Sequence, residues 1–126
     1  MTNDVIADFL ARMQNAIVRK NEEIVVPSAK MVDEMVRILK DEKMIGGFEK
    51  VGKDIKIALL YNEGEAVISK FRRVSKSGQR IYVKADKILP IMNGRGISVV
   101  STSFGVMTGA QAKNKGLGGE LICEIW

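Results

Sequence analysis

The spacing of apolar residues changes about halfway along this 126-residue chain. In residues 6–17, and again in residues 31–39, apolar side chains recur at intervals of three and four, which is the period of an amphipathic helix. Beyond residue 62 that period is lost, and short apolar runs are separated by segments rich in Gly, Ser and Thr. We therefore expect helices packed on strands in the first half and mostly strands in the second.

The two expected helices have recognisable ends. Thr2 or Asn3 can cap the first helix, because a short polar side chain at that position accepts a hydrogen bond from a free backbone N–H group. Ser28 can cap the second helix in the same way, and the pair Gly46-Gly47 is expected to end it.

The remaining elements follow from short alternating or β-branched runs bounded by turn residues. In the first half these runs predict a helix-strand-helix-strand-strand unit, with two helices on one face of a small sheet. In the second half they predict an antiparallel sheet with one short helix. The expected strands cover residues 23–26, 48–51, 53–61, 66–74, 81–84, 97–100 and 120–126, and the short helix covers 110–115.

The turn over residues 62–65 is the natural boundary between these halves. We predict an α+β fold of two small lobes, an N-terminal α/β lobe over residues 1–65 and a C-terminal β-rich lobe over residues 66–126.

Several classes of protein are disfavoured by what the chain lacks. It has no histidine, the commonest general base and imidazole metal ligand, and its single cysteine permits no internal disulfide. We predict no catalytic residue, cofactor or metal, and interpret Cys123, Met31 and Met35 as core residues. There is no long apolar run and no start resembling a secretory signal, so we expect a cytoplasmic protein without membrane contact or small-molecule substrate.

Charge is divided unequally along the chain, whose formal net charge is +5. Residues 1–70 hold 11 Lys/Arg against 12 Asp/Glu, a balance of −1, whereas residues 71–126 hold 9 against 3, a balance of +6. Such asymmetry indicates that the second half meets a polyanion.

A run of hydroxyl side chains marks the second half. Four of them and a glycine lie within residues 101–108, directly after an apolar strand, where we expect the backbone to leave the sheet. Small hydroxyl groups suit ribose 2′-hydroxyls, phosphate oxygens and base edges of irregular RNA. An ordinary surface loop with self-capping Ser and Thr is the alternative interpretation.

Four cations gather around the polar turn of residues 72–80, and Tyr82 follows on the next strand. Cations that contact phosphates, beside an aromatic ring, are a common RNA-binding combination. A solvated hairpin tip is the alternative.

The segment 116–120 contains three glycines but lacks the Lys-Ser/Thr pair of a phosphate-binding loop. We interpret it as a tight turn that returns the last strand beside the hydroxyl segment. Glu120 is then expected to order that segment by accepting hydrogen bonds from its hydroxyl or N–H groups.

These motifs resemble the family of the eighth protein of the bacterial small ribosomal subunit. The similarity extends from the first helix to the terminal aromatic residue. It is carried by Asp4-x-Ile6-Ala7-Asp8, Arg12-x-x-Asn15-Ala16, Pro27-Ser28-x-Lys30, Arg73-Val74-Ser75-Lys76 with Tyr82, Ser101-Thr102-Ser103-x-Gly105-Val106-Met107-Thr108 and Gly116-x-Gly118-Gly119-Glu120.

The resemblance implies direct binding to the central domain of small-subunit ribosomal RNA, assembly of the subunit platform, and contact with the fifth and twelfth proteins of that subunit. In the family, the hydroxyl segment contacts a bulged RNA helix, and the first lobe also approaches RNA. Together with the basic turn, the matched positions give the predicted RNA-binding residues Ser101, Thr102, Ser103, Phe104, Gly105, Thr108, Tyr82, Glu120, Arg73, Lys76, Arg80, Ser28, Lys30, Asp4, Arg12 and Asn15.

Three residues depart from the family pattern: Val5 stands where Pro is usual, Phe104 where a basic or polar residue is usual, and Gly109 where Asp is common. The first affects only entry into the helix. The other two lie in the binding loop and can alter how it is held or how it meets the RNA. The ring of Phe104 can pack inward on the second lobe or stack on an unpaired base or sugar.

Three other functions deserve comparison with ribosomal RNA binding. Some members of the family also bind their own messenger RNA and repress its translation. A protein-binding adaptor using the acidic and apolar first lobe is the rival from a different class, and an enzyme is a distant third.

Overall fold

A computed structural model describes residues 4–126, so the Thr2 or Asn3 cap lies outside the described residues. The chain divides into two compact units, one ending at Ser69 and the other running from Lys70 to Trp126. This division falls four residues beyond the expected boundary. That residues 1–65 and 66–126 form separate lobes stays a prediction.

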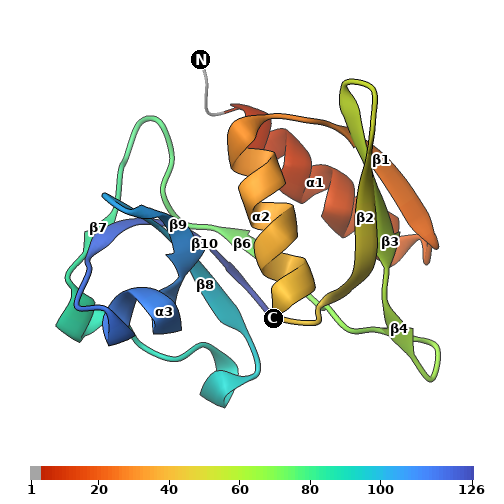
Figure 1. The fold of residues 1–126 in the computed structure, drawn as a ribbon. Helices are drawn as coiled ribbons and strands as arrows, with labels where there is room; N and C mark the ends of the chain where they lie inside the picture. The colour runs from red at the N-terminus through yellow and green to blue at the C-terminus, as the bar shows by residue number, and fades with distance from the viewer. Residues whose placement is uncertain (1–3) are drawn as a thin grey trace. The chain divides into compact units, whose positions relative to one another are not determined.

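The first unit is a three-stranded antiparallel sheet with two helices on one face (Figure 1). The order along the chain is α1, β1, α2, β2, β3, as predicted, and the order in the sheet is β1-β3-β2. A small hairpin, β4-β5, ends the unit. The bounds are α1 Asp4–Val18, β1 Glu23–Pro27, α2 Lys30–Asp41, β2 Ile45–Val51, β3 Asp54–Leu59, β4 Tyr61–Asn62 and β5 Glu65–Ala66.

The core of this unit lies between the helices and the sheet. Phe9 and Met13 of α1, Leu39 of α2, and Ile55 and Ile57 of β3 are all buried. Each such side chain contributes about 1.5–3 kcal/mol by leaving water. Met35 is buried and Met31 half-buried, which confirms Met35 as a core residue.

Both predicted ends of α2 are wrong. The N-cap residue is Ala29, without a side-chain cap, because the Ser28 hydroxyl donates to the Asp33 carboxylate at 2.8 Å instead. At the other end the helix stops at Asp41, where Lys43 adopts a left-handed conformation with φ of 59°. The pair at 46–47 lies in β2, at an irregularity in its pairing with β3.

The second unit is an antiparallel sheet with β10 at its centre (Figure 1). The main order is β6-β10-β8-β9, and β7 also pairs with β10. Only 71–73 of the expected strand over 66–74 belongs to this sheet. The bounds are β6 Phe71–Arg73, β7 Tyr82–Val83, η1 Ala85–Lys87, η2 Met92–Gly94, β8 Ile97–Thr102, β9 Gly105–Thr108, α3 Gly109–Asn114 and β10 Gly119–Ile125.

One core of this unit lies where α3 meets the sheet, around Val100, Met107 and Ala112. Cys123 is buried in β10, and burial raises the pKa of its thiol to about 12. The thiol therefore stays protonated and acts as a small apolar side chain, as predicted.

The glycines before β10 allow a close approach of backbone to backbone. A Cβ atom on Gly118 would lie 2.5 Å from the carbonyl oxygen of Val83, and one on Gly119 would lie 2.2 Å from that of Ser101. Gly116 adopts a left-handed conformation with φ of 69°. The segment is thus the predicted tight turn, and the absence of side chains at Gly118 and Gly119 lets β10 pair with β7 and β8 at once.

Candidate RNA-binding site

A row of side chains crosses the second sheet from β7 to β8. Glu120 of β10 lies opposite Tyr82 of β7 and opposite Ser101 of β8. Directly opposed residues of an antiparallel sheet project from the same face, so these three side chains share one surface. Tyr82 is 70% exposed, a large apolar ring left in solvent by the unit's own packing.

The hydroxyl segment is a β-hairpin, so the expectation that its backbone leaves the sheet is wrong. Pairing of β8 with β9 continues to Thr102 and Gly105, which leaves only residues 103 and 104 in the turn. The Thr102 hydroxyl accepts from the Phe104 N–H group at 3.0 Å and donates to the Gly105 carbonyl at 2.8 Å. This hydroxyl holds the turn in shape, and Ser103 is exposed beside it. We call residues 101–108 the hydroxyl hairpin.

Phe104 lies at the tip of the hydroxyl hairpin and is 77% exposed. The interpretation in which its ring packs inward is therefore wrong. Stacking on RNA stays a prediction.

Thr108 lies at the base of the hairpin and is buried. Its hydroxyl caps α3 by accepting from the Gln111 N–H group at 3.1 Å, and the Gln111 side chain accepts from the Thr108 N–H group. This reciprocal pair satisfies two backbone donors and joins the hairpin to α3. At the neighbouring departure from the family, a Cβ atom on Gly109 would lie 2.0 Å from the Ser98 hydroxyl oxygen, so the Ser98 side chain would have to move to admit a larger residue.

The arginines of residues 72–80, a segment that we call the basic turn, are held by hydrogen bonds to their surroundings. Arg80 donates to Glu120 Oε2 at 2.9 Å, and Arg72 donates to Glu124 at 3.2 Å. Arg73 Nε donates to the Ser75 carbonyl. Lys76 is exposed, and its backbone bonds reciprocally with that of Gln79.

Glu120 accepts its hydrogen bonds from the basic turn and not from the hydroxyl hairpin. The prediction that Glu120 orders the hydroxyl segment is therefore wrong. Besides Arg80, its partner is the Ser75 hydroxyl at 2.5 Å. Ser75 is fully buried and was not among the predicted RNA-binding residues. A serine within a run of Arg, Lys, Ser and Gly gives no sign of burial, and only the position of the following strand reveals it.

Burial opposes ionisation of Glu120, but hydrogen bonds from Ser75 and Arg80 and the charges of Arg80 and Arg73 outweigh it. Together they hold the pKa of the carboxyl below its ordinary value of 4.5. The group is an anion at neutral pH, placed to fix cations that would otherwise sample many rotamers.

A pH dependence of stability follows from this pKa. A carboxyl whose pKa is lower in the folded than in the unfolded chain stabilises the fold above the unfolded pKa, and this contribution is lost as pH falls through the folded pKa. We expect the thermal midpoint of Glu120→Gln to change less than that of the unaltered chain as pH is lowered below about 4.5. Asp33→Asn is the control for acid sensitivity of the first unit, since the Asp33 pKa is also lowered. Parallel pH profiles for Glu120→Gln and the unaltered chain would contradict the assignment.

The predicted residues of the first unit are spread over α1, the loop before α2, and α2 itself. Arg12 of α1 pairs with Asp8 at 2.8 Å, and Asn15 is exposed on the same helix. Ser28 is half-buried and accepts from Lys50 Nζ at 2.9 Å, whereas Lys30 is exposed. Nothing is described of the Asp4 side chain, so its predicted contact lies outside the described residues.

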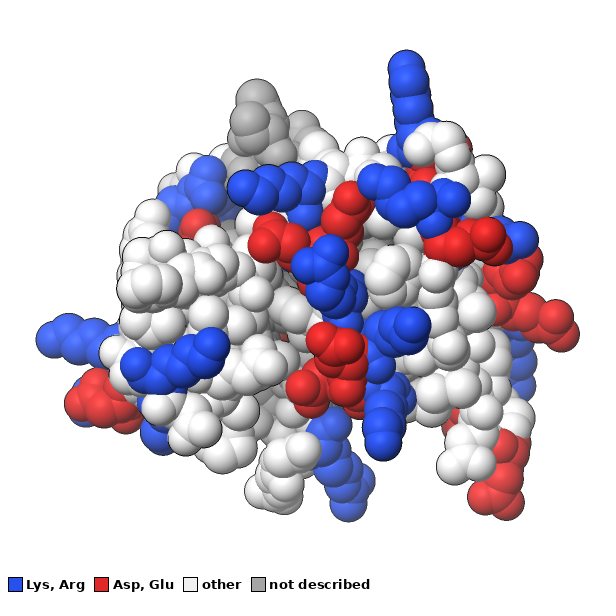
Figure 2. Space-filling view, in the orientation of Figure 1, with Lys and Arg blue, Asp and Glu red and all other residues white. Residues whose placement is uncertain are grey.

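Charge alone does not mark a site. On the face shown in Figure 2, Lys and Arg side chains project among acidic ones, with broad uncharged areas between them. The arrangement of donors and rings in the second unit is therefore more informative than net charge.

None of the helices within residues 4–126 is long and apolar enough to span a bilayer.

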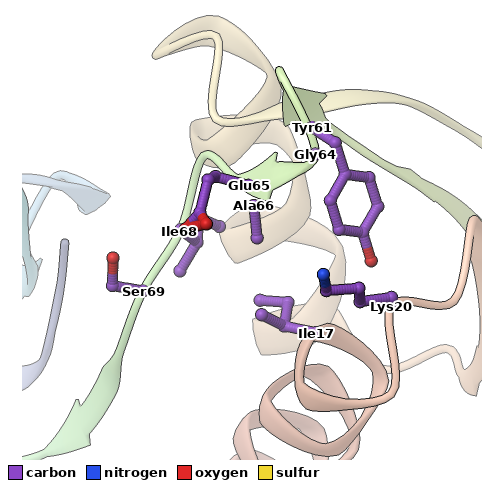
Figure 3. Close-up of a pocket in the computed structure, with 8 residues that line it drawn as sticks. All are labelled: Ile17, Lys20, Tyr61, Gly64, Glu65, Ala66, Ile68 and Ser69. Carbon is purple, nitrogen blue, oxygen red and sulfur yellow. The ribbon is translucent and has the colours of Figure 1, made fainter.

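The first unit contains a cavity of about 200 Å³ beside Ile17 of α1 and the hairpin β4-β5 (Figure 3). The Lys20 amine points into it, and the Tyr61 ring forms one wall. The Tyr61 hydroxyl donates to the Asn21 carbonyl at 2.6 Å, so it joins the hairpin β4-β5 to the loop between α1 and β1. These groups include no nucleophile paired with a general base, so we assign no reaction to the cavity.

Comparison with known proteins agrees with the RNA-binding interpretation. Residues 4–126 match the family described as ribosomal protein S8. The chain is 41% identical to the small ribosomal subunit protein uS8 of Dehalococcoides mccartyi and 45% identical to that of Oleidesulfovibrio alaskensis, with the whole of each chain aligned. The chain belongs to the ribosomal protein S8 family. The S8 protein of Mesoplasma florum is 44% identical, again over both full lengths.

Membership of the S8 family confirms the resemblance seen in the sequence. It also confirms the prediction that the chain is a structural constituent of the small ribosomal subunit and not an enzyme. The predicted location, in the cytoplasm and in that subunit, is confirmed on the same ground. Which residues of this S8 chain contact RNA is a separate question, addressed by the geometry of the second unit.

Proposed function

We propose that this S8 chain binds the central domain of small-subunit ribosomal RNA directly and helps to assemble the platform of the subunit. The observation that carries the proposal is the row Tyr82, Glu120 and Ser101, which places an exposed ring and a hydroxyl on one face and joins the basic turn to it through Glu120. Most of the sequence-specific affinity is assigned to residues 66–126.

Each part of this surface supplies a different interaction. Lys76 and the held arginines are suited to phosphates, which gives affinity that weakens as salt rises. The hydroxyls of Ser101 and Ser103 are suited to 2′-hydroxyls and phosphate oxygens of an irregular helix, and Tyr82 to stacking on a base. Thr102 and Thr108 act through the shape of the hairpin, because their hydroxyls are already bonded within it.

Other partners are proposed with less detailed support. We assign the fifth and twelfth proteins of the small subunit as neighbours, and the exposed apolar side chains of Leu89 and Met92 support a protein contact on the second unit. A messenger RNA that presents the same irregular helix would compete for the surface that binds ribosomal RNA. The residues of the first unit, Arg12, Asn15, Ser28 and Lys30, are assigned weaker contacts.

Charge removal at two places tests the assignment. We expect Arg73→Gln/Lys76→Gln to weaken binding of a central-domain ribosomal RNA fragment and to lower the slope of log affinity against log salt by roughly one to two, because each lost phosphate contact removes about 0.7–0.9 of slope. Filter binding at a series of salt concentrations measures both quantities.

The matched control is Lys20→Gln/Lys43→Gln, which removes the same charge from the first unit. It should leave the slope nearly unchanged. Equal losses from both pairs of substitutions would mean that net charge, and not the basic turn, governs binding.

A further inference from the structure

We infer that Ser75 is a positioning residue for RNA binding, whose buried hydroxyl holds the basic turn in the geometry in which Arg73 and Arg80 meet RNA. The inference rests on the proposed function. It assigns a role to a residue that neither charge nor exposure would single out.

Ser75 is the hub of the hydrogen bonds at the basic turn. Its hydroxyl donates to Glu120 Oε2 at 2.5 Å and accepts from the Ile81 N–H group at 3.1 Å, while its carbonyl accepts from Arg73 Nε. One residue thus contacts the arginine before the turn, the backbone after it, and the central strand beside it. The side chain is fully buried, so water does not replace these partners.

The backbone reinforces the same attachment. The N–H groups of Val74 and Ser75 both donate to the Ile122 carbonyl, at 3.0 and 3.3 Å, and the Leu121 N–H group donates to the Ile81 carbonyl at 2.9 Å. Both ends of the turn are therefore fastened to β10. Only the tip, where Lys76 and Gln79 bond reciprocally, projects away from these attachments.

The acidic group in this network explains why the serine is needed. An anion such as Glu120 on an RNA-facing surface repels phosphate unless its charge is used within the protein. Both of its hydrogen bonds end on Oε2, so Ser75 and Arg80 share one oxygen and are brought together there. The Ser75 hydroxyl keeps the carboxylate directed at the turn, where it orients Arg80.

Orientation matters because an arginine side chain loses rotamer freedom when it is immobilised. In this chain, that ordering occurs on folding, so contact with phosphate does not have to supply it. Loss of the Ser75 hydroxyl leaves the cations present but removes the bonds that direct Glu120 at the turn and fix the Ile81 backbone, so Arg80 and the turn are held less firmly. The effect should then appear in RNA binding as well as in protein stability.

Ser75→Ala is the direct test, with a central-domain ribosomal RNA fragment and a random-sequence duplex of equal length as probes. We expect about tenfold weaker binding of the fragment and a salt slope lower by roughly one, measured well below the thermal midpoint. Ser98→Ala is the matched control, since it removes another buried serine hydroxyl of the same unit, opposite Glu124 and not Glu120 in the sheet, and should leave both unchanged.

A second variant keeps the test decisive if Ser75→Ala folds poorly. Glu120→Gln preserves the side-chain shape but releases Arg80 and adds one unit of net positive charge. Positioning predicts weaker binding of the fragment together with equal or tighter binding of the random duplex. Tighter binding of both probes would show instead that Glu120 acts only by repulsion and would overturn the inference.

A double substitution separates positioning from a general structural role. In an Arg73→Gln/Arg80→Gln background, Ser75→Ala should have little further effect on binding, because the cations that it positions are gone. An undiminished loss there, or normal affinity and slope in folded Ser75→Ala, would exclude the role. If the unaltered chain fails to prefer the fragment over the duplex, the proposed function itself fails, which is a different result.

Discussion

Gly119→Ala should destabilise the chain by about 3 kcal/mol and abolish tight binding of the central-domain RNA fragment. The added Cβ atom would lie 2.2 Å from the Ser101 carbonyl oxygen and 3.1 Å from a Val100 methyl group. Backbone cannot rotate away as a flexible side chain can, so β10 must separate from β8, and overpacking of this kind costs about 1–3 kcal/mol or more. Thermal unfolding followed by circular dichroism should show a midpoint lower by roughly 8 °C or more.

Gly78→Ala is the control for this substitution. Gly78 lies in the basic turn with open space around the added atom and without the left-handed backbone that favours glycine. Its thermal midpoint should stay within about 2 °C of the unaltered chain. A Gly119→Ala protein that melts normally would mean that β10 and β8 are not as close as described.

The order of the elements was predictable because each helix and strand leaves a local pattern. Residues 31–39 have the helical period and form part of α2, and the alternation of Ile55 and Ile57 places both in the core. Ends were less predictable because they depend on competing partners. Ser28 has the side chain of a helix cap, but its hydroxyl donates its hydrogen bond to the Asp33 carboxylate of the following helix instead.

The candidate site, like the fold, has parts that were predictable from the sequence and parts that were not. The hydroxyl hairpin and the basic turn were selected by composition, since their side chains are unusual for their positions. The connection between Ser75 and Glu120 was not predictable, because it joins residues 45 positions apart in sequence through a strand register. The expected partner of Glu120 was wrong for that reason: Ser101 is its neighbour in the sheet, yet the hydrogen bonds come from the other side.

Phe104→Ala should weaken binding of the RNA fragment about tenfold to hundredfold while leaving the thermal midpoint and the salt slope nearly unchanged. The ring is 77% exposed at the tip of the hydroxyl hairpin, so its loss removes little packing. Stacking of an aromatic ring on a base contributes about 1–3 kcal/mol and depends little on salt. Leu89→Ala is the control, because Leu89 is a similarly exposed apolar residue of the same unit, 71% accessible.

Phe104→Lys distinguishes stacking of an aromatic ring on a base from a charge contact with phosphate at the same position. A cation at the hairpin tip reaches phosphate and releases counterions, so affinity should recover at low salt and fall more steeply as salt rises, by roughly one unit of slope. The hydrogen bonds of Thr102 that shape the turn involve the backbone N–H group of residue 104 and the Gly105 carbonyl, and no side-chain atom of residue 104. They are therefore preserved in both variants. If Phe104→Ala bound normally, the ring would have no part in RNA recognition. If it bound weakly but melted several degrees lower, the loss would come from the hairpin itself, and the lysine variant would then fail to restore binding at any salt concentration.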